Sequence, residues 1–341
     1  MTTFTDVVAH STFDVEMPSI LSILILIFVL SGLPLYTVPL STSTLPRRTF
    51  IVSSPLLLLS PNPALSSPLP TATPVPKPTL ELYNRALSLQ STGNLPSSLP
   101  LLQRVTDMTP NWSYGWSSLG DVQVALGDVP SALKSYESAI DLDGNEYGSV
   151  KDPYLLRLNY GCALLNSGED GLLPPALAQL EAAARLRNRP DALTLVNRGL
   201  AYDYLKRYPQ AVSDYEVAVQ LSKEVQPWWL RRAMCKLEIG DASGARDAWR
   251  RVENRFPDSA EVNIVGYVIH QRLNEGEKAK ECLGKVPEGK MEEYRREEVR
   301  RRKLRWGVAM EEGFAKAVEE RDRDRDREME SGEEAKKVNA A

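Results

Sequence analysis

Internal repetition is the strongest constraint on the fold of this chain of 341 residues. Residues 116–140, 195–219 and 229–252 align without gaps, and each segment has glycine or alanine at its fifth position. Alanine follows twelve residues later, and an aromatic residue follows four after that. Antiparallel helices approach closely only where side chains are small, and bulky side chains fill the space one turn away. The columns therefore predict helix pairs that cross at the small residues. The repeat-defining residues are Trp116, Gly120, Ala132, Tyr136, Gly199, Ala211, Tyr215, Trp229, Ala245 and Trp249.

The order W-x2-L-G, then alanine, an aromatic residue and alanine, resembles the tetratricopeptide repeat. The resemblance covers residues 79–287 as five good units and one degenerate unit, and three of the steps between units are 34 residues, the period of this family. The units start near Thr79, Ser113, Tyr154, Ala192, Gln226 and Ala260. The resemblance implies an all-α fold, a right-handed α-solenoid of stacked antiparallel helix pairs, because one pair cannot bury its apolar face alone. The Gly-Asp pairs at 127–128 and 240–241 are predicted to turn the chain between helices, and Arg207 with Tyr208 to replace one such pair.

A stack of this kind needs a solvated end, and the sequence after the last unit offers one. Residues 288–322 are predicted to form one charged capping helix, in which Val299, Trp306, Met310, Phe314 and Ala317 lie near one face. A helix that binds a partner is the alternative interpretation. Arginines between residues 295 and 305 alternate with glutamates, which is typical of a solvated helix and argues against nucleic acid as a partner. Residues 323–341 are predicted to be a disordered tail.

The first 66 residues form a targeting or leader region. The apolar run 20–30 has the length of a signal-peptide core, and acidic residues before it raise the question whether the chain starts at Met1 or Met17. Residues 44–66, with Arg47 and Arg48 before an apolar stretch, resemble a twin-arginine peptide, which implies import into a plastid and its thylakoid lumen. The secretory pathway, with membrane association through residues 20–30 if they are not cleaved, and the cytosol are the alternatives. Residues 67–78 are a Pro-rich linker.

The composition offers little for catalysis. The formal net charge is −4, so no global field attracts nucleic acid. There are two histidines and three scattered cysteines, and no CxxC pair, phosphate-binding glycine loop or GxSxG motif is present. We therefore expect no enzyme activity, no cofactor and no metal site.

The resemblance also implies where a partner would bind, because in this family the first helix of each unit lines the concave surface. One row of such positions is polar and consists of Asn84, Ser118, Asn159, Asn197 and Arg231. Asparagine carries a donor and an acceptor, so a row of them can pair with the backbone of an extended peptide; alternatively, the row only tolerates polar residues facing water. The neighbouring positions are apolar and include Leu155, Leu158, Leu193, Val196, Leu200, Leu230 and Met234. Such a surface indicates a binding groove, covered either by an external partner or by the chain's own C-terminal helix or Pro-rich linker.

Together, these expectations predict a non-catalytic scaffold that holds an extended client segment in its concave groove. The family's clamp for acidic chaperone tails uses lysines where this chain has Leu158 and Pro227, and asparagine where it has Cys162, so such a tail is not the expected client. If the leader does direct the chain to a plastid, an assembly factor for photosynthetic complexes is the expected role. A general adaptor of the cytosol or secretory pathway is the alternative.

Overall fold

The computed structural model describes residues 73–145, 147, 152–187, 189–222 and 224–339. The leader, with its apolar run at 20–30 and its twin-arginine-like segment at 44–66, lies outside the described residues, as does the first half of the Pro-rich linker. The first described helix begins at Lys77, just before the start of the solenoid predicted at Thr79. Among the described helices, none combines the length and the apolar character that crossing a membrane requires.

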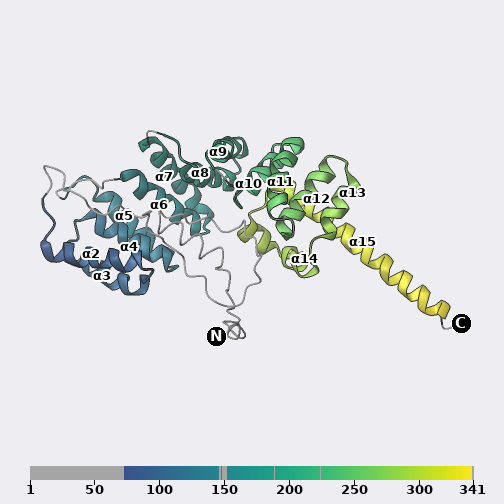
Figure 1. Ribbon diagram of the computed structural model, residues 1–341, viewed down its shortest axis with the longest axis horizontal. Coiled ribbons are helices and arrows are strands. Elements are labelled where there is room, and N and C mark those ends of the chain that lie inside the picture. Colours follow the sequence, from purple (N-terminus) through teal and green to yellow (C-terminus); the bar gives the residue numbers. More distant parts are fainter. Residues whose placement is uncertain (1–72, 146, 148–151, 188, 223, 340–341) are drawn as a thin grey trace, which may run out of the picture.

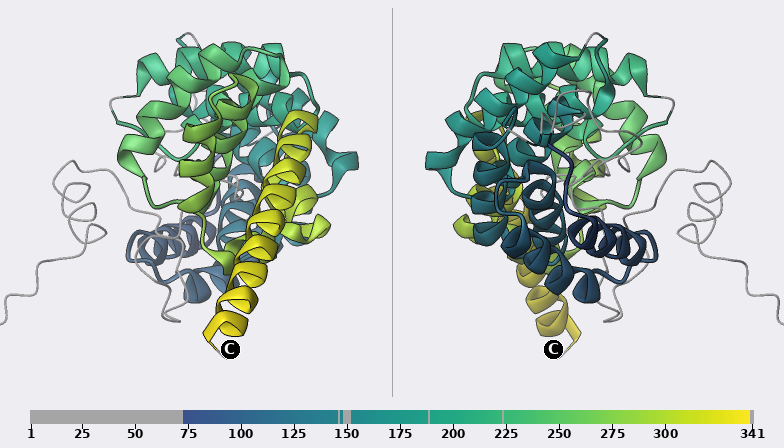
Figure 2. Two further views of the ribbon diagram at one scale, coloured as in Figure 1. Left: turned by 90° about the vertical axis from the view of Figure 1, so that its right-hand side faces the viewer. Right: turned by 90° about the vertical axis from the view of Figure 1, so that its left-hand side faces the viewer.

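Within the described residues, six antiparallel helix pairs follow one another in a stack (Figure 1). The pairs are α2 (Lys77–Ser91) with α3 (Leu95–Met108), α4 (Ser113–Ala125) with α5 (Val129–Asp141), α6 (Pro153–Asn166) with α7 (Leu173–Leu186), α8 (Ala192–Tyr204) with α9 (Tyr208–Leu221), α10 (Trp229–Glu238) with α11 (Ala242–Arg255), and α12 (Ala260–Arg272) with α13 (Gly276–Gly284). A short 3-10 helix, η1 (Asp170–Leu172), precedes α7. This is the stacked helix-pair solenoid that the repeat predicts. Figure 2 views it from either end of its long axis.

Close crossings at small residues hold each pair together. A Cβ atom added at Gly120 would lie 2.9 Å from the ring of Tyr136, and one added at Gly199 would lie 2.9 Å from the ring of Tyr215. Gly161 has the same relation to Leu180 in the third pair, at 2.7 Å. Both tyrosines are completely buried, as expected for side chains that fill the space beside a crossing.

The turns inside the pairs share one backbone geometry. Each turn within the described chain contains a residue with positive φ, and these residues are Gly93, Gly127, Gly168, Lys206, Gly240 and Asn274. In three of the pairs the next residue is Asn94, Asp128 or Asp241, whose side chain caps the second helix by accepting a hydrogen bond from a backbone N–H. The sequence prediction for the fourth turn was displaced by one residue, because Lys206 and Arg207 occupy the turn and Tyr208 already begins α9.

The C-terminal region differs from the single capping helix that the sequence predicts. It consists of α14 (Glu288–Arg295), a π-helical turn η2 (Val299–Leu304) and α15 (Val308–Asn339). The break falls where Arg305 has a φ of 45° and where Gly307 lies so close to Glu238 and Tyr208 that no Cβ would fit.

The long helix α15 has a buried beginning and an exposed end. Met310, Phe314 and Ala317 are buried, on the helical face that the sequence predicted. The helix then continues to Asn339 through the segment predicted to be disordered, and it projects from the stack in Figure 1. Ion pairs three residues apart, such as Arg325–Asp322 and Arg327–Asp324, give this polar stretch local support.

Candidate functional site

The first helix of each pair lies on the inner side of the stack. α4 contacts α6, α6 contacts α8, and α10 contacts α12, so these helices touch across successive pairs as well as within them. Direct contact between first helices is expected on the more tightly curved side of a solenoid. The positions that the sequence assigns to a groove therefore belong to the inner helices α2, α4, α6, α8 and α10.

The predicted polar row is mostly occupied by contacts inside the molecule. Asn84 is exposed, but Ser118, Asn159, Asn197 and Arg231 are buried. The Ser118 hydroxyl is 2.9 Å from the hydroxyl of Tyr83, on the preceding inner helix. Asn159 donates to Asp121 at 3.0 Å, again across neighbouring inner helices. The expectation of a polar row open to solvent thus needs correction, because adjacent inner helices close over these side chains and use them to bind one another.

Asn197 differs from the other asparagines of the row. Its amide nitrogen donates to the carbonyl of Leu193 one turn earlier on α8, at 3.0 Å. Its Oδ1 is buried and has no hydrogen-bond partner. A buried acceptor without a donor is costly, and such groups in native structures call for an explanation. Asn197 therefore uses its donor within α8 and keeps a buried acceptor that no donor of the described residues reaches.

Asp121 joins two helix pairs through its carboxylate. Tyr136 donates to it at 2.7 Å from α5, in addition to the bond from Asn159 on α6. Burial raises the pKa of Asp121 to about 7, and the two hydrogen bonds offset only part of that effect. The carboxyl therefore links the second and third pairs, and it binds a proton far more readily than an exposed aspartate does.

The predicted apolar floor is largely internal packing. Leu155, Leu158, Val196, Leu200, Leu230 and Met234 are buried, and Leu193 is half-buried. The other half-buried leucines at groove positions are Leu80 and Leu87 on α2. The apolar surface that stays open on the inner side is thus smaller than the sequence predicted. Most of the leucine, valine and methionine positions assigned to it are buried in contacts between neighbouring inner helices.

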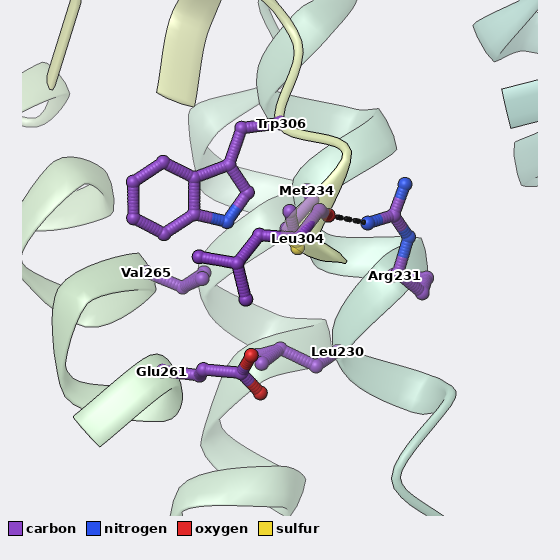
Figure 3. A pocket seen from close by; sticks show the side chains of 7 residues that line it. All are labelled: Leu230, Arg231, Met234, Glu261, Val265, Leu304 and Trp306. Atoms are coloured by element: carbon purple, nitrogen blue, oxygen red, sulfur yellow. Dashed lines mark hydrogen bonds between the residues drawn. The ribbon is translucent and has the colours of Figure 1, made fainter. Parts of the chain in front are cut away.

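At the C-terminal end of the stack, the chain's own C-terminal region covers the inner face. Arg231 on α10 donates to the carbonyl oxygens of Leu304 at 2.7 Å and of Arg305 at 3.3 Å. Figure 3 shows Leu304 and Trp306 beside Leu230, Arg231 and Met234 of α10 and beside Glu261 and Val265 of α12. The sequence left three possible occupants of the groove, which are an external partner, the C-terminal helix and the Pro-rich linker. At this end of the stack, the C-terminal region occupies it.

A buried charge network surrounds this contact. Arg231 is 2% exposed and forms an ion pair with Asp203 of α8 at 2.6 Å. Burial acts to lower the pKa of Arg231, but Asp203 together with Tyr204, Tyr215 and Cys235 outweighs it and the net shift is upward, so the guanidinium stays charged. Arg305 pairs with Asp170 at 2.8 Å, donates to the carbonyl of Gly168 and lies 4.6 Å from the ring centre of Tyr204. The network joins the α6–α7 turn, α8 and α10 to the C-terminal region.

The start of α15 is fixed by the same part of the stack. Glu238, at the end of α10, accepts hydrogen bonds from the backbone N–H groups of Ala309 at 3.0 Å and Met310 at 3.2 Å. A carboxylate at a helix N-terminus satisfies unpaired donors and complements the helix dipole. Sequence reasoning missed Asp203, Tyr204, Asp170 and Glu238. The available signal was a carboxylate, Asp203, among the mostly apolar residues at the end of an inner helix, together with one arginine in a row of asparagine and serine.

The repeat-defining residues lie where helix pairs meet. Trp116 is half-buried and donates from its indole nitrogen to the carbonyl of Pro110 at 2.7 Å, while the others pack in the core. The cysteines Cys162, Cys235 and Cys282 are buried and unpaired. His270 lies 2.6 Å from Glu275 and edge-on to Trp249. In the part of the chain that the structure describes, no group of three or more His, Cys, Asp or Glu residues is placed to hold a metal ion.

Comparison with known proteins gives two matches to family models, both described as tetratricopeptide repeat, over residues 83–147 and 229–259. A curated relative, the Hsp70-Hsp90 organizing protein of Triticum aestivum, is 32% identical over 65 residues. That match covers 19% of this chain and 11% of the relative, so the chain corresponds to only a small part of that protein.

One solved structure of low identity shares the architecture, and a second is similar over about half of the chain. PilW, a type IV pilus biogenesis factor, superimposes with a TM-score of 0.50 at 12% identity, over 70% of this chain and 98% of PilW. YrrB, a TPR protein with an unusual peptide-binding site, gives a TM-score of 0.46 at 17% identity, over 54% of this chain and 89% of YrrB. Residues 83–147 and 229–259 therefore match tetratricopeptide repeat models, and stacked helix pairs of the same kind continue between and beyond these two segments.

Proposed function

We propose that this protein is a non-catalytic scaffold that holds an extended segment of a client protein along the inner face of its N-terminal pairs. Tetratricopeptide repeat proteins are generally scaffolds for protein binding, and the matched repeats lie in the first two pairs and in the fifth. The proposal rests on which inner helices the C-terminal region contacts. Its contacts lie on the α6–α7 turn, α8, α10 and α12, at the far end from α2 and α4.

The inner face of α2 has the chemistry of a peptide site. Asn84 is exposed and offers a donor and an acceptor to a passing backbone. Leu80 and Leu87 are half-buried one turn to either side and offer apolar contact. Backbone pairing with small apolar contacts recognises an extended segment without demanding one sequence.

A selection of random twelve-residue peptides displayed on phage against the purified chain tests this proposal. We expect selected peptides to bind at least tenfold more weakly to the Asn84→Lys and Leu87→Asp variants than to the unmodified chain, because both changes alter the inner face of α2. The matched control is Arg104→Glu on α3, an exposed residue of the other helix in the same pair. Peptides whose affinity responds to Arg104→Glu but not to the two α2 variants would contradict the proposal.

We also propose a plastid location, with the thylakoid lumen as its destination and photosynthetic complexes as the source of clients. The support is the leader alone: the apolar run at 20–30 followed by the twin-arginine-like segment at 44–66. The test is the N-terminal sequence of the protein isolated from cells, together with the position of a fluorescent fusion. A start near Ser67 inside plastids supports this proposal, whereas an intact Met1 in the cytosol favours a general adaptor.

A further inference from the structure

We propose that the cleft between α8, α10 and α12 is a second peptide-binding site, occupied by the chain's own residues 304–306, called here the inserted segment. The site accepts in exchange an extended client segment with an aliphatic residue followed by arginine. This inference rests on the proposed scaffold function and deepens it, because it assigns a sequence preference to the part of the inner face that the C-terminal region covers.

The inserted segment is held partly through its main chain. The guanidinium of Arg231 donates to the carbonyl oxygens of Leu304 and Arg305, and its charge is fixed by Asp203. Main-chain carbonyls are common to all peptides, so this contact does not depend on the side chains of the segment. Arg231 also stands at the end of the polar row that the sequence assigned to backbone recognition. Here it pairs with a backbone that comes from the same chain.

Two side chains of the inserted segment give the site its preference. Leu304 is buried against Leu230, Met234 and Val265, which form an apolar contact for one aliphatic residue. Arg305 meets the carboxylate of Asp170, the carbonyl of Gly168 and the face of Tyr204. A carboxylate, a carbonyl and an aromatic face together suit the planar guanidinium of arginine and do not suit a neutral or acidic side chain.

The inserted segment is strained, while the elements on both sides of it are independently anchored. Arg305 has a φ of 45°, a left-handed conformation that residues other than glycine rarely adopt. Before it, Arg295 at the end of α14 forms an ion pair with Asp322 of α15 at 2.6 Å. After it, Glu238 caps α15, and Tyr267 of α12 donates to Glu320 of α15 at 2.8 Å. The segment can therefore leave its cleft while α14 and α15 stay attached to the stack.

Because the inserted segment is tethered on both sides, it competes at a high local concentration. Effective concentrations of short tethers are in the millimolar range, so an added peptide binds the unmodified chain weakly. Weakening the contacts of Arg305 lowers the occupancy by the inserted segment and raises the apparent affinity for an added peptide. Arg305→Ala is the suitable change, since it removes these contacts from the inserted segment and leaves Asp170, whose side chain is 86% exposed, available to the added peptide.

The experiment measures fluorescence anisotropy of a labelled peptide with the sequence of residues 299–310, added to the full chain. We expect the Arg305→Ala chain to bind this peptide at least tenfold more tightly than the unmodified chain. The Asp170→Ala chain should show no such gain, because it lacks the carboxylate that the arginine of the added peptide also needs. Glu169→Ala, at the neighbouring exposed position, is the matched control and should bind like the unmodified chain. A peptide carrying Arg305→Glu should lose binding, whereas one carrying Arg302→Ala should keep it, because Arg302 is exposed.

Hydrogen exchange of residues 300–310 in the same chains decides the remaining outcomes. If exchange accelerates in the Arg305→Ala chain and the peptide still does not bind, the cleft is not a peptide site and the inference is overturned. If exchange stays slow in both variant chains, the inserted segment is a fixed part of the core and the inference is likewise overturned. Peptide binding that is lost in the Asn84→Lys chain would place the peptide on α2 instead. The phage selection tests peptide binding at that α2 surface. The failure of one proposal can therefore be told apart from the failure of the other.

Discussion

At the scale of single residues, the fold depends on glycines, which have no side chain and let two helices cross closely. Gly120 and Gly199 leave room for the rings of Tyr136 and Tyr215, and the sequence reveals this directly because the same columns recur. The residues that close the inner face were harder to predict. Arg231 forms hydrogen bonds with a residue 28 positions before it and with one 73 positions after it. A local sequence pattern does not predict contacts at such separations. Burial of the asparagine row escaped prediction for a related reason, since it depends on how closely successive pairs stack.

Gly199→Ala tests the crossing in the fourth pair. The added methyl group would lie 2.9 Å from a tyrosine ring that is fully buried, so ring or helix must move. We expect a net loss of about 1–3 kcal/mol in the free energy of unfolding, measured in urea. The matched control is Gly284→Ala in α13, where a Cβ meets no atom within 4 Å. That change should gain about 0.5–1 kcal/mol, because alanine loses less entropy in a helix than glycine. Equal effects of the two substitutions would show that the crossing does not depend on the glycine.

At the scale of elements, the helix pairs were predictable and the C-terminal helices were not. The small and aromatic columns mark the paired helices, and glycine with aspartate marks two of the turns between them. The interruption between α14 and α15 depends on Gly307 fitting against Glu238 and Tyr208, two residues of other pairs. The long end of α15 was predicted to be disordered because its composition is polar, whereas the helix is supported by ion pairs along its own surface.

The fourth turn can be improved by giving it the residues of its neighbours. Lys206 has a φ of 58°, and Arg207 has the same backbone geometry as Asp128 and Asp241 but provides no side-chain cap. We expect Lys206→Gly with Arg207→Asp to stabilise the protein by about 1–2 kcal/mol, through relief of the left-handed conformation and a new helix cap. Thermal unfolding measures the gain. The reverse change in the next turn, Gly240→Ala, should lower the melting temperature. A double variant that melts below the unmodified chain would refute this account of the turn.

At the scale of the whole molecule, the C-terminal region completes the stack and also limits its open surface. Each pair in a solenoid is stabilised by its neighbours, so the last pair needs a partner with a polar outer face. α15 supplies this by packing Met310, Phe314 and Ala317 against the end of the stack, with Gly313 pressed against Val268 of α12. The sequence predicted such a cap. It did not predict that the residues leading into α15 lie on the inner face, where a client was expected.

Two truncations separate the buried start of α15 from its exposed end. Ending the chain after Arg323 keeps the bond between Tyr267 and Glu320, and among the residues that it removes, 324–333 have exposed side chains. We therefore expect a free energy of unfolding within about 0.5 kcal/mol of the full chain. Ending it after Gly307 uncovers α12 and removes two fully or nearly fully buried large side chains, Met310 and Phe314, each contributing about 1.5–3 kcal/mol. The last pair should then unfold at lower urea than the rest, with fast hydrogen exchange in α12 and α13 and slow exchange in α4 to α9. If the shorter chain instead unfolds in one transition at the original midpoint, α15 is an appendage, and the closing of the inner face must come from η2 alone.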